Sequence, residues 1–251
     1  MTIPSTRLAQ LNSGQDASKN LAEGLAVDFA ALMAAALPQA DAALLDEMRA
    51  AAPLGISKRM LLAGELVYRA VGAQGLARLA AHRSDTVRGW ICYALAHEHA
   101  LHSPEPLENL LEAVRPFADD AHFGVREWVW MAVRPHLAKQ PEHALRHLAG
   151  WTADPSERVR RFASESTRPR GVWCAHLNIL KENPALGLPV LEPLQADPST
   201  YVQDSVGNWL NDAAKSQPQW VSALCDAWLA QNPGKATARI CKRALRSLHK
   251  K

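Results

Sequence analysis

The hydrophobic and polar positions of this chain follow a helical period, and one phrase recurs along them. The phrase is a short polar turn, then Val-Arg or its equivalent, then about three turns of amphipathic helix. Its apolar register residues are Val87, Val125, Val159, Val202 and Ala238, so the spacings are 38, 34, 43 and 36 residues. Repeats of this length are typical of HEAT and armadillo units. The pattern predicts an all-α, HEAT-like helical repeat solenoid whose inner helices line a concave face.

Turn and breaker residues divide the chain into helices. Asp residues precede the phrase helices where N-caps and Asx turns belong; they are Asp85, Asp119 or Asp120, Asp154 and Asp197. Proline cannot continue the backbone ladder, so Pro135 and Pro169 are predicted to end the helices of the second and third units. Second helices are expected over residues 141–151 and 217–231, each with a proline at an early position.

The N-terminal third has helical periodicity but lacks the phrase. Residues 18–36, 40–52 and 57–81 are each predicted to be helical. We therefore expect a single repeat domain over residues 17–251, with atypical capping helices over 17–81 and repeats over 82–251. Residues 1–16 are expected to be a flexible N-terminal segment.

The charge is unevenly distributed. The net charge is +3, but residues 1–110 carry 9 Lys and Arg against 11 Asp and Glu, whereas residues 111–251 carry 19 against 14. Seven cations and no acid follow Asn232: Lys235, Arg239, Lys242, Arg243, Arg246, Lys250 and Lys251. This asymmetry suggests a polyanionic partner and a basic binding face. On charge alone, a solvated tail that ends the last helix is an equal alternative.

The remaining composition indicates a soluble, cytoplasmic protein. The four cysteines (Cys92, Cys174, Cys225 and Cys241) are scattered without metal-ligand spacing, as in reduced cytosolic chains. Residues 1–20 lack the layout of a signal peptide, and the most apolar run, residues 29–40, is too short to span a bilayer. We expect no metal, no cofactor, no membrane association and a monomer.

Alignment of the phrase helices on the register residue places polar side chains at equivalent positions. Residues two, six and nine positions after it share one side of each helix. In the second, third and fourth units they are Glu127, Met131 and Arg134; Arg161, Glu165 and Arg168; and Asp204, Asn208 and Asn211. A solvated helix face is the simpler interpretation of any one of these rows. Acids and bases that recur at the same register favour a site instead.

Tryptophans and arginines flank this stripe. Eight of the few aromatic residues are Trp, and Trp128, Trp130, Trp173 and Trp209 lie beside the polar positions. Each Trp taken singly is more often a core residue, by roughly two to one. Five arginines and Trp173 surround Glu165 in residues 158–173, however, and this concentration is typical of a site; the arginines are Arg158, Arg160, Arg161, Arg168 and Arg170.

Four blocks carry a family resemblance. They are residues 17–29 (ASKNLAEGLAVDF), 123–130 (FGVREWVW), 157–173 (ERVRRFASESTRPRGVW) and 201–212 (YVQDSVGNWLND). They resemble the AlkC branch of the AlkC/AlkD DNA alkylation repair glycosylases, and the resemblance extends over nearly the whole chain. Some members of that branch append a β-sandwich domain after the repeats, and we expect this chain to lack it.

The resemblance implies hydrolysis of the N-glycosidic bond of cationic alkylated bases, such as 3-methyladenine or 3-methylcytosine, in duplex DNA without base flipping. Carboxylates stabilise an oxocarbenium-like centre and place a water. The implied catalytic residues are Glu165 foremost, then Glu127, Asp204 and Trp173. The expected DNA-binding residues are Arg158, Arg160, Arg161, Arg168, Arg170, Lys242, Arg243 and Arg246.

Two other functions remain open at this stage. A non-catalytic HEAT scaffold could bind DNA or protein through the same face. The three acids argue against it, because they would repel phosphate in a purely DNA-binding groove. A metal hydrolase is less favoured, because no H-x-x-x-H or H-E-x-x-H pair lies near the stripe.

Overall fold

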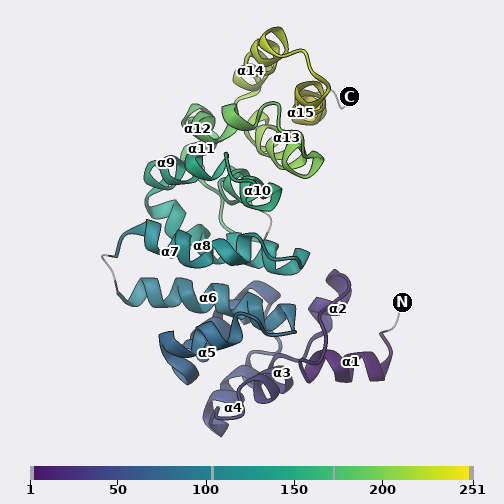
Figure 1. Cartoon of the computed structure of the whole chain (residues 1–251), viewed down its shortest axis with the longest axis vertical. Coiled ribbons are helices and arrows are strands. Elements are labelled where there is room, and N and C mark those ends of the chain that lie inside the picture. Colours follow the sequence, from purple (N-terminus) through teal and green to yellow (C-terminus); the bar gives the residue numbers. More distant parts are fainter. Residues whose placement is uncertain (1–2, 103–104, 172, 249–251) are drawn as a thin grey trace. The chain divides into compact units, whose positions relative to one another are not determined.

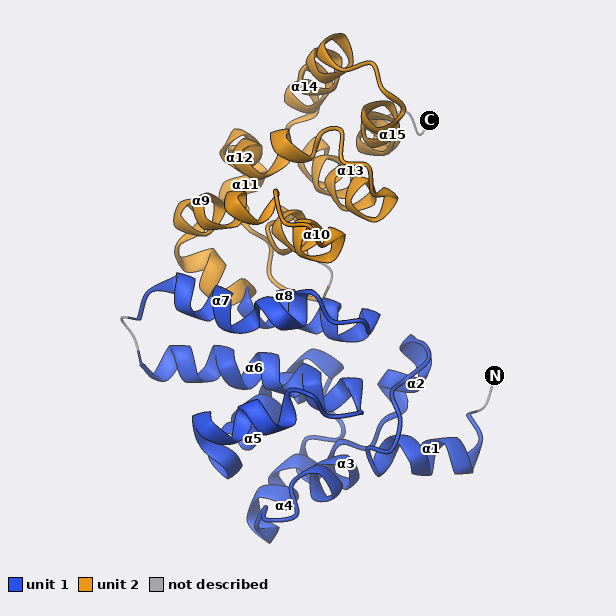
Figure 2. Cartoon of the chain, viewed as in Figure 1, with its two compact units in different colours: residues 1–133 blue, residues 134–251 orange. Residues whose placement is uncertain are grey.

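The structure, a computed structural model, describes residues 3–102, 105–171 and 173–248 (Figure 1). Every secondary-structure element in these ranges is a helix, which confirms the prediction of an all-α fold. The chain separates into two compact units, residues 1–133 and 134–251 (Figure 2), whereas the sequence predicts a single domain over 17–251. Their boundary falls within one long helix, α8 (Phe123–Lys139).

Unit 1 begins with short helices and continues with long ones (Figure 1). Its elements before α8 are α1 (Ser5–Asn12), α2 (Leu21–Ala26), α3 (Phe29–Ala36), α4 (Ala42–Ala50), α5 (Ile56–Leu79), α6 (Asp85–Leu101) and α7 (Leu107–Ala118). Helices α5 and α6 pack very closely, because a Cβ on Gly64 would lie 2.4 Å from the Cβ of Tyr93. Around this contact the core buries Met60, Leu66 and Trp90.

Helix α1 (Ser5–Asn12) lies within residues 1–16, the segment that the sequence predicts to be flexible. Leu11 of α1 is buried. The guanidinium of Arg7 donates to the Glu23 carboxylate at 2.6 Å and to the Ala17 carbonyl at 2.7 Å. A helix this short is marginal in isolation. Tertiary contacts of this kind, which sequence periodicity does not show, stabilise it here.

Unit 2 alternates phrase helices with the helices that connect them. Its elements after α8 are α9 (Pro141–Trp151), α10 (Glu157–Ser166), α11 (Asn178–Glu182), η1 (Pro184–Gly187), α12 (Leu188–Leu191), η2 (Glu192–Leu194), α13 (Thr200–Ala214), α14 (Pro218–Gln231), α15 (Lys235–Ala244) and η3 (Leu245–Ser247). Helix α13 packs against both α10 and α15. The helices predicted over 141–151 and 217–231 are therefore present as α9 and α14.

The polar turn of the phrase caps the helix that follows it. The hydroxyls of Ser84, Ser156 and Ser199 accept backbone N–H groups in the first turns of α6, α10 and α13. The predicted Asx turns are also present: the Asp154 carboxylate accepts the Ser156 N–H, and the Asp197 carboxylate accepts the Ser199 N–H, each at 2.8 Å.

The arginine of the phrase joins consecutive repeats. In unit 2, Arg160 donates to both carboxylate oxygens of Asp197 at 2.7 and 3.1 Å, and to the carbonyls of Asp154 and Pro155 in its own turn. In unit 1, Arg88 donates to both oxygens of Asp120 at the same two distances and to two carbonyls of its own turn. The recurrence of Val-Arg therefore reflects a structural contact between repeats.

Three boundaries differ from the predictions. Helix α8 continues through Pro135 to Lys139, so this proline does not end the helix. A proline within a helix costs about 3 kcal/mol, and the neighbouring Val133 and Leu137 are buried in the core. The helix predicted over 18–36 is two helices, because Asp28 caps α3 at its start. Gly72 has a φ of 60° and kinks α5.

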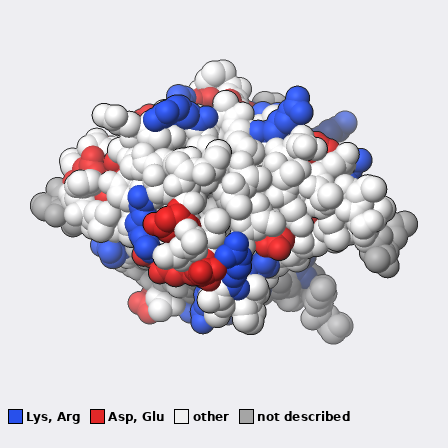
Figure 3. Space-filling model, turned by 90° about the horizontal axis from the view of Figure 1, so that it is seen from below, with Lys and Arg blue, Asp and Glu red and all other residues white. Residues whose placement is uncertain are grey.

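The surface in Figure 3 carries acidic and basic side chains close together on a largely uncharged background. The concave, basic binding face therefore stays a prediction. Within the described ranges, no helix has both the length and the apolar character that crossing a membrane requires.

Candidate functional site

The acid at the centre of the predicted site, Glu165, lies in the last turn of α10 and is 3% exposed. Its Oε1 accepts a hydrogen bond from Arg168 at 2.7 Å, and its Oε2 accepts one from the Ser205 hydroxyl at 2.7 Å. Arg161 lies one turn earlier, with its Nη2 3.6 Å from Oε2. Local helical spacing brings the two arginines to the carboxylate, as the sequence predicts.

Arg168 also donates to a second acid that the sequence analysis did not name. Its Nε lies 2.9 Å and its Nη2 2.8 Å from Oδ2 of Asp212, which is on α13 and 3% exposed. We call Arg161, Glu165, Arg168, Ser205 and Asp212 the Glu165 network. It links α10 to α13 through buried, charge-assisted hydrogen bonds.

The network holds Glu165 in its ionised form. Burial is the largest single influence on the carboxyl and acts to raise its pKa. The charges of Arg161 and Arg168, with hydrogen bonds from Ser205 and Arg168, outweigh burial and bring the pKa of Glu165 below its usual value. For Arg168, burial again acts first and lowers the pKa, but Glu165 and Asp212 raise it overall. The result is a fixed, water-poor array of opposite charges.

The fourth-unit acid, Asp204, belongs to a different cluster between α13 and α15. Its Oδ1 lies 2.8 Å from Arg239 Nη2 and 3.1 Å from Arg243 Nη1, and its side chain is 37% exposed. Arg243 reaches Asn208 at 2.9 Å by passing over Gly207, where a Cβ would lie 2.8 Å from the arginine Cβ. This cluster is more open to solvent than the Glu165 network.

The polar stripe therefore lies along contacts between consecutive phrase helices. Glu165 and Arg168 face α13, Asp204 and Asn208 face α15, and Asn211 is buried with its amide donating to the Ala244 carbonyl. The solvated-face interpretation does not hold for these positions. Much of the row that the sequence predicts is buried between helices.

The second-unit acid, Glu127, is in unit 1 and is half-buried on α8. Its Oε2 accepts the indole N–H of Trp130 at 3.0 Å. Trp130 itself is buried, as is Trp209 of unit 2, whose indole N–H donates to the Thr167 carbonyl at 2.9 Å. These two tryptophans are core residues.

Trp173 is the exposed member of the set. It lies in the segment that follows α10, is 52% exposed, and has a φ of 62°. A bulky residue in this left-handed region is strained and persists only where its surroundings over-determine the conformation. An indole held open to solvent in a strained loop is suited to contact a ligand.

The predicted DNA-binding arginines differ in how many hydrogen bonds their side chains already make within the protein. Arg160 makes the contact between repeats described above, with its side chain 14% exposed. Arg170 donates to the Asp212 carbonyl at 3.2 Å and to the Ser216 hydroxyl at 2.7 Å, which places it beside the Glu165 network. Arg158 is half-buried.

The predicted C-terminal cations lie on α15 and η3. Lys242 is exposed, and Arg246 donates to the Arg243 carbonyl at 3.1 Å. Burial, followed by repulsion from Arg243, lowers the pKa of Arg246, and smaller effects come from Asp212 and Asp204. Arg246 therefore lies near both clusters. Lys250 and Lys251 fall outside the described residues.

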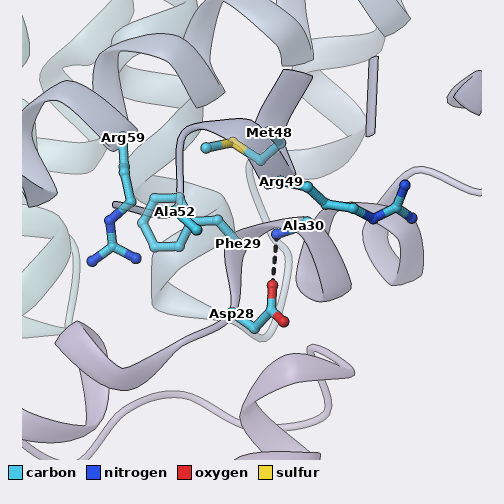
Figure 4. A pocket seen from close by; sticks show the side chains of 7 residues that line it. All are labelled: Asp28, Phe29, Ala30, Met48, Arg49, Ala52 and Arg59. Carbon is cyan, nitrogen blue, oxygen red and sulfur yellow. Dashed lines mark hydrogen bonds between the residues drawn. The ribbon is translucent and has the colours of Figure 1, made fainter. Parts of the chain in front are cut away.

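A separate pocket of about 310 Å³ lies in unit 1 (Figure 4). The guanidinium of Arg59 stacks over the Phe29 ring at 4.8 Å, and Asp28 accepts the Ala30 N–H at 3.0 Å. The side chains of Arg49 and Arg59 point away from one another. The pocket therefore lacks the converging cations that an anion site needs. Across the described residues, no three His, Cys, Asp or Glu side chains are grouped to hold a metal.

Comparison with known proteins adds the decisive observation. A family model described as "DNA alkylation repair enzyme" matches residues 97–248, which include both clusters and Trp173. The chain belongs to this family of DNA alkylation repair enzymes. Helices α10, α13 and α15, which carry both clusters, thus lie within the matched part of the chain.

Solved structures agree with the assignment to the DNA alkylation repair family. The alkylpurine DNA glycosylase AlkC of Pseudomonas fluorescens, solved bound to DNA containing an abasic site analog, matches with a TM-score of 0.69 and 28% identity. The match covers 98% of this chain and 65% of that one. AlkD2 of Streptococcus mutans matches with a TM-score of 0.61 and 20% identity over 81% of this chain and 96% of its own, which shows a common fold.

Among curated proteins, the uncharacterized protein YhaZ of Bacillus subtilis is 42% identical over 120 residues. The matched part is 48% of this chain and 33% of YhaZ. The match therefore covers about a third of the length of YhaZ, and the match to AlkC covers less than two thirds of AlkC.

Proposed function

We propose that this chain is a DNA glycosylase that hydrolyses the N-glycosidic bond of cationic alkylated bases in duplex DNA. The observation that carries the proposal is Glu165, an ionised carboxylate held at 3% exposure between two arginines in the part of the chain that the family model matches. Its relative AlkC is an alkylpurine DNA glycosylase and was solved on DNA with an abasic site analog.

The chemistry requires little acid catalysis. An alkylated base that already bears a positive charge is a good leaving group, so bond cleavage mainly develops positive charge on the deoxyribose. A fixed carboxylate in a water-poor site stabilises that charge more strongly than one in bulk water. Glu165 supplies such a charge, and Asp212 holds Arg168 in place beside it. The more exposed Asp204 is a candidate for orienting the attacking water.

The exposed indole of Trp173 is assigned to the lesion. An indole 52% open to solvent offers a face for the sugar or the damaged base without any enclosed pocket. We therefore propose catalysis without base flipping, in contrast to glycosylases that extrude their target. Such an enzyme tolerates larger alkyl groups, so it should release a bulkier N3-alkyl adenine as well as 3-methyladenine.

Affinity for the duplex is assigned to cations that the two clusters leave accessible. Lys242, Arg246, Arg158 and Arg170 are the proposed phosphate contacts, and such contacts confer affinity without sequence preference. Arg243 joins them at the edge of the Asp204 cluster. Arg160 is assigned to the repeat contact instead, because Asp197 and two carbonyls already accept its donors.

The test is release of free base from methylated duplex DNA under single-turnover conditions. We expect the wild type to release 3-methyladenine or 3-methylcytosine and Glu165→Gln to be slower by at least about a hundredfold, as for loss of one electrostatic stabiliser. Glu182→Gln, an exposed acid of α11, is the matched control and should retain full activity. Glu127→Gln and Asp204→Asn rank the other two acids.

Three outcomes would contradict parts of the proposal. Wild-type release no faster than a protein-free blank refutes the glycosylase and, if the protein still binds DNA, favours a non-catalytic scaffold. Full activity in both Glu165→Gln and Glu127→Gln refutes the assignment of the acids. Release limited to small methyl adducts refutes catalysis without an enclosed pocket.

A further inference from the structure

Arg134 of α8 is a buried guanidinium that lies in unit 2 but outside the Glu165 network as defined above. It is 2% exposed. Its Nη1 donates to the Ser166 carbonyl at 3.0 Å, its Nη2 to the Arg168 carbonyl at 2.5 Å, and its Nε to the Ala175 carbonyl at 2.9 Å. All three acceptors are backbone carbonyls: Ser166 ends α10, and Arg168 and Ala175 lie in the segment that connects α10 to α11.

This segment leaves α10 and returns on itself. The Leu177 N–H donates to the Pro169 carbonyl at 3.0 Å, which brings the outgoing and returning parts together. Arg134 contacts both parts, because Ser166 and Arg168 lie before the turn and Ala175 lies after it. Gly171 completes the fit: a Cβ there would lie 2.0 Å from the Cys174 sulfur and 3.2 Å from Arg134 Nε.

In the sequence, Trp173 lies between Arg168 and Ala175, whose carbonyls both accept hydrogen bonds from Arg134. Its φ of 62° costs energy for any residue with a Cβ, and its side chain is 52% exposed. A strained exposed residue relaxes unless hydrogen bonds on either side hold the backbone. The three bonds from Arg134 hold Ser166, Arg168 and Ala175, the last of them two residues after Trp173.

The three carbonyls explain why an arginine occupies this buried position. Burying a cation is costly, and a hydrophobic side chain of similar size usually stabilises a core as well or better. The planar fork is what three differently placed carbonyls require, and the single ammonium group of lysine cannot reproduce it.

We propose that Arg134 is a positioning residue that fixes the backbone at Ser166, Arg168 and Ala175 and thereby orients Trp173 toward the DNA lesion. The inference rests on the proposed glycosylase function, since the lesion is the target of Trp173 in that proposal. Arg134 itself touches no substrate in this scheme and acts through Trp173.

A double-mutant cycle with base release as the measurement tests the inference. Arg134→Lys should slow single-turnover release by roughly tenfold to a hundredfold, the scale of a misplaced contact, while the KM for methylated duplex changes by less than about threefold. In a Trp173→Ala background, Arg134→Lys should cause no further loss. Equal losses in both backgrounds, or a loss confined to KM, would overturn the proposal.

A second measurement requires no substrate. In protein labelled with 5-fluorotryptophan, Trp173→Phe identifies the ¹⁹F resonance of Trp173. Arg134→Lys should shift or broaden that resonance and leave the buried Trp90 and Trp228 resonances in place, which also shows that the variant is folded. Arg134→Gln serves the same purpose if the lysine variant does not fold.

The two measurements separate the two claims. An unchanged Trp173 resonance in folded Arg134→Lys or Arg134→Gln refutes the positioning role whether or not the protein releases base. A displaced resonance together with a wild type that releases no base refutes the glycosylase function and still supports the positioning of Trp173 by Arg134.

Discussion

The two ends of helix α10 place arginine against acid in different ways. At the start, Arg160 binds Asp197 in a paired contact that unit 1 repeats with Arg88 and Asp120 at the same distances. At the end, Arg168 bridges Glu165 and Asp212, and α6 has Ala96 where α10 has Arg168. The recurring contact joins repeats, whereas the bridge made by Arg168 does not recur: Arg134, at the same register of the second unit, donates to backbone carbonyls instead. We therefore expect departures from the repeat to point to functional residues better than charge alone does.

The largest expected effect is on the free energy of unfolding. It distinguishes the Arg160–Asp197 contact, which joins repeats, from the Glu165 network. Asp197→Ala leaves Arg160 without its carboxylate partner, and loss of one member of a buried pair costs about 3 kcal/mol. Asp120→Ala in unit 1 should cost a similar amount, because it breaks the same contact. Urea denaturation followed by circular dichroism measures both. Near-wild-type unfolding of either variant would contradict the structural role of the contact between repeats. Slower base release by the folded Asp197→Ala protein would contradict its separation from the candidate site.

A smaller effect concerns pH. The pKa of Glu165 is lowered in the folded protein, so its charge contributes stability above the unfolded value, about 4.3. That contribution is lost as the pH falls through the folded pKa. The free energy of unfolding of wild type minus that of Glu165→Gln should be constant near pH 7 and narrow below about pH 4. A difference that widens in acid would show that the ionised carboxylate does not stabilise the fold.

The smallest expected effect is on DNA affinity. Lys242 is exposed on α15 and contributes to neither buried cluster. Lys242→Ala should weaken duplex binding a few-fold, with about one unit less in the slope of log affinity against log salt, and leave the single-turnover rate unchanged. Fluorescence anisotropy at three salt concentrations measures the slope. Lys181→Ala on α11 is the control, and an equal slope change there would make the effect nonspecific.

The repeat fold was predictable because its determinants are local. Ser156 and Ser199 cap the helices that their turns precede, and Asp154 and Asp197 form the turns expected of them. These contacts involve neighbours in sequence, which a period and a turn residue reveal. Pro135 was misread because packing around α8 outweighs the lost hydrogen bond, and packing is not visible in a single sequence.

The site was predictable only in part, for the same reason. Arg161 and Arg168 are four and three residues from Glu165, so helical spacing placed them together. Ser205 and Asp212 come from α13, 40 and 44 residues from their partners Glu165 and Arg168, and nothing local indicates that these residues meet. The three hydrogen bonds from Arg134 could not be predicted, because their acceptors are backbone carbonyls, which every residue has.

The widest spacing of the phrase, 43 residues from Val159 to Val202, has a consequence for how such arrays acquire new chemistry. It contains the Trp173 segment and the short helices α11 and α12. Each unit of a solenoid contacts only its neighbours, and closing a longer loop costs little extra free energy. An insertion at a turn is therefore tolerated without re-engineering the rest of the array. We therefore expect an exchange of this one turn between family members to alter lesion preference and to leave the helical framework untouched.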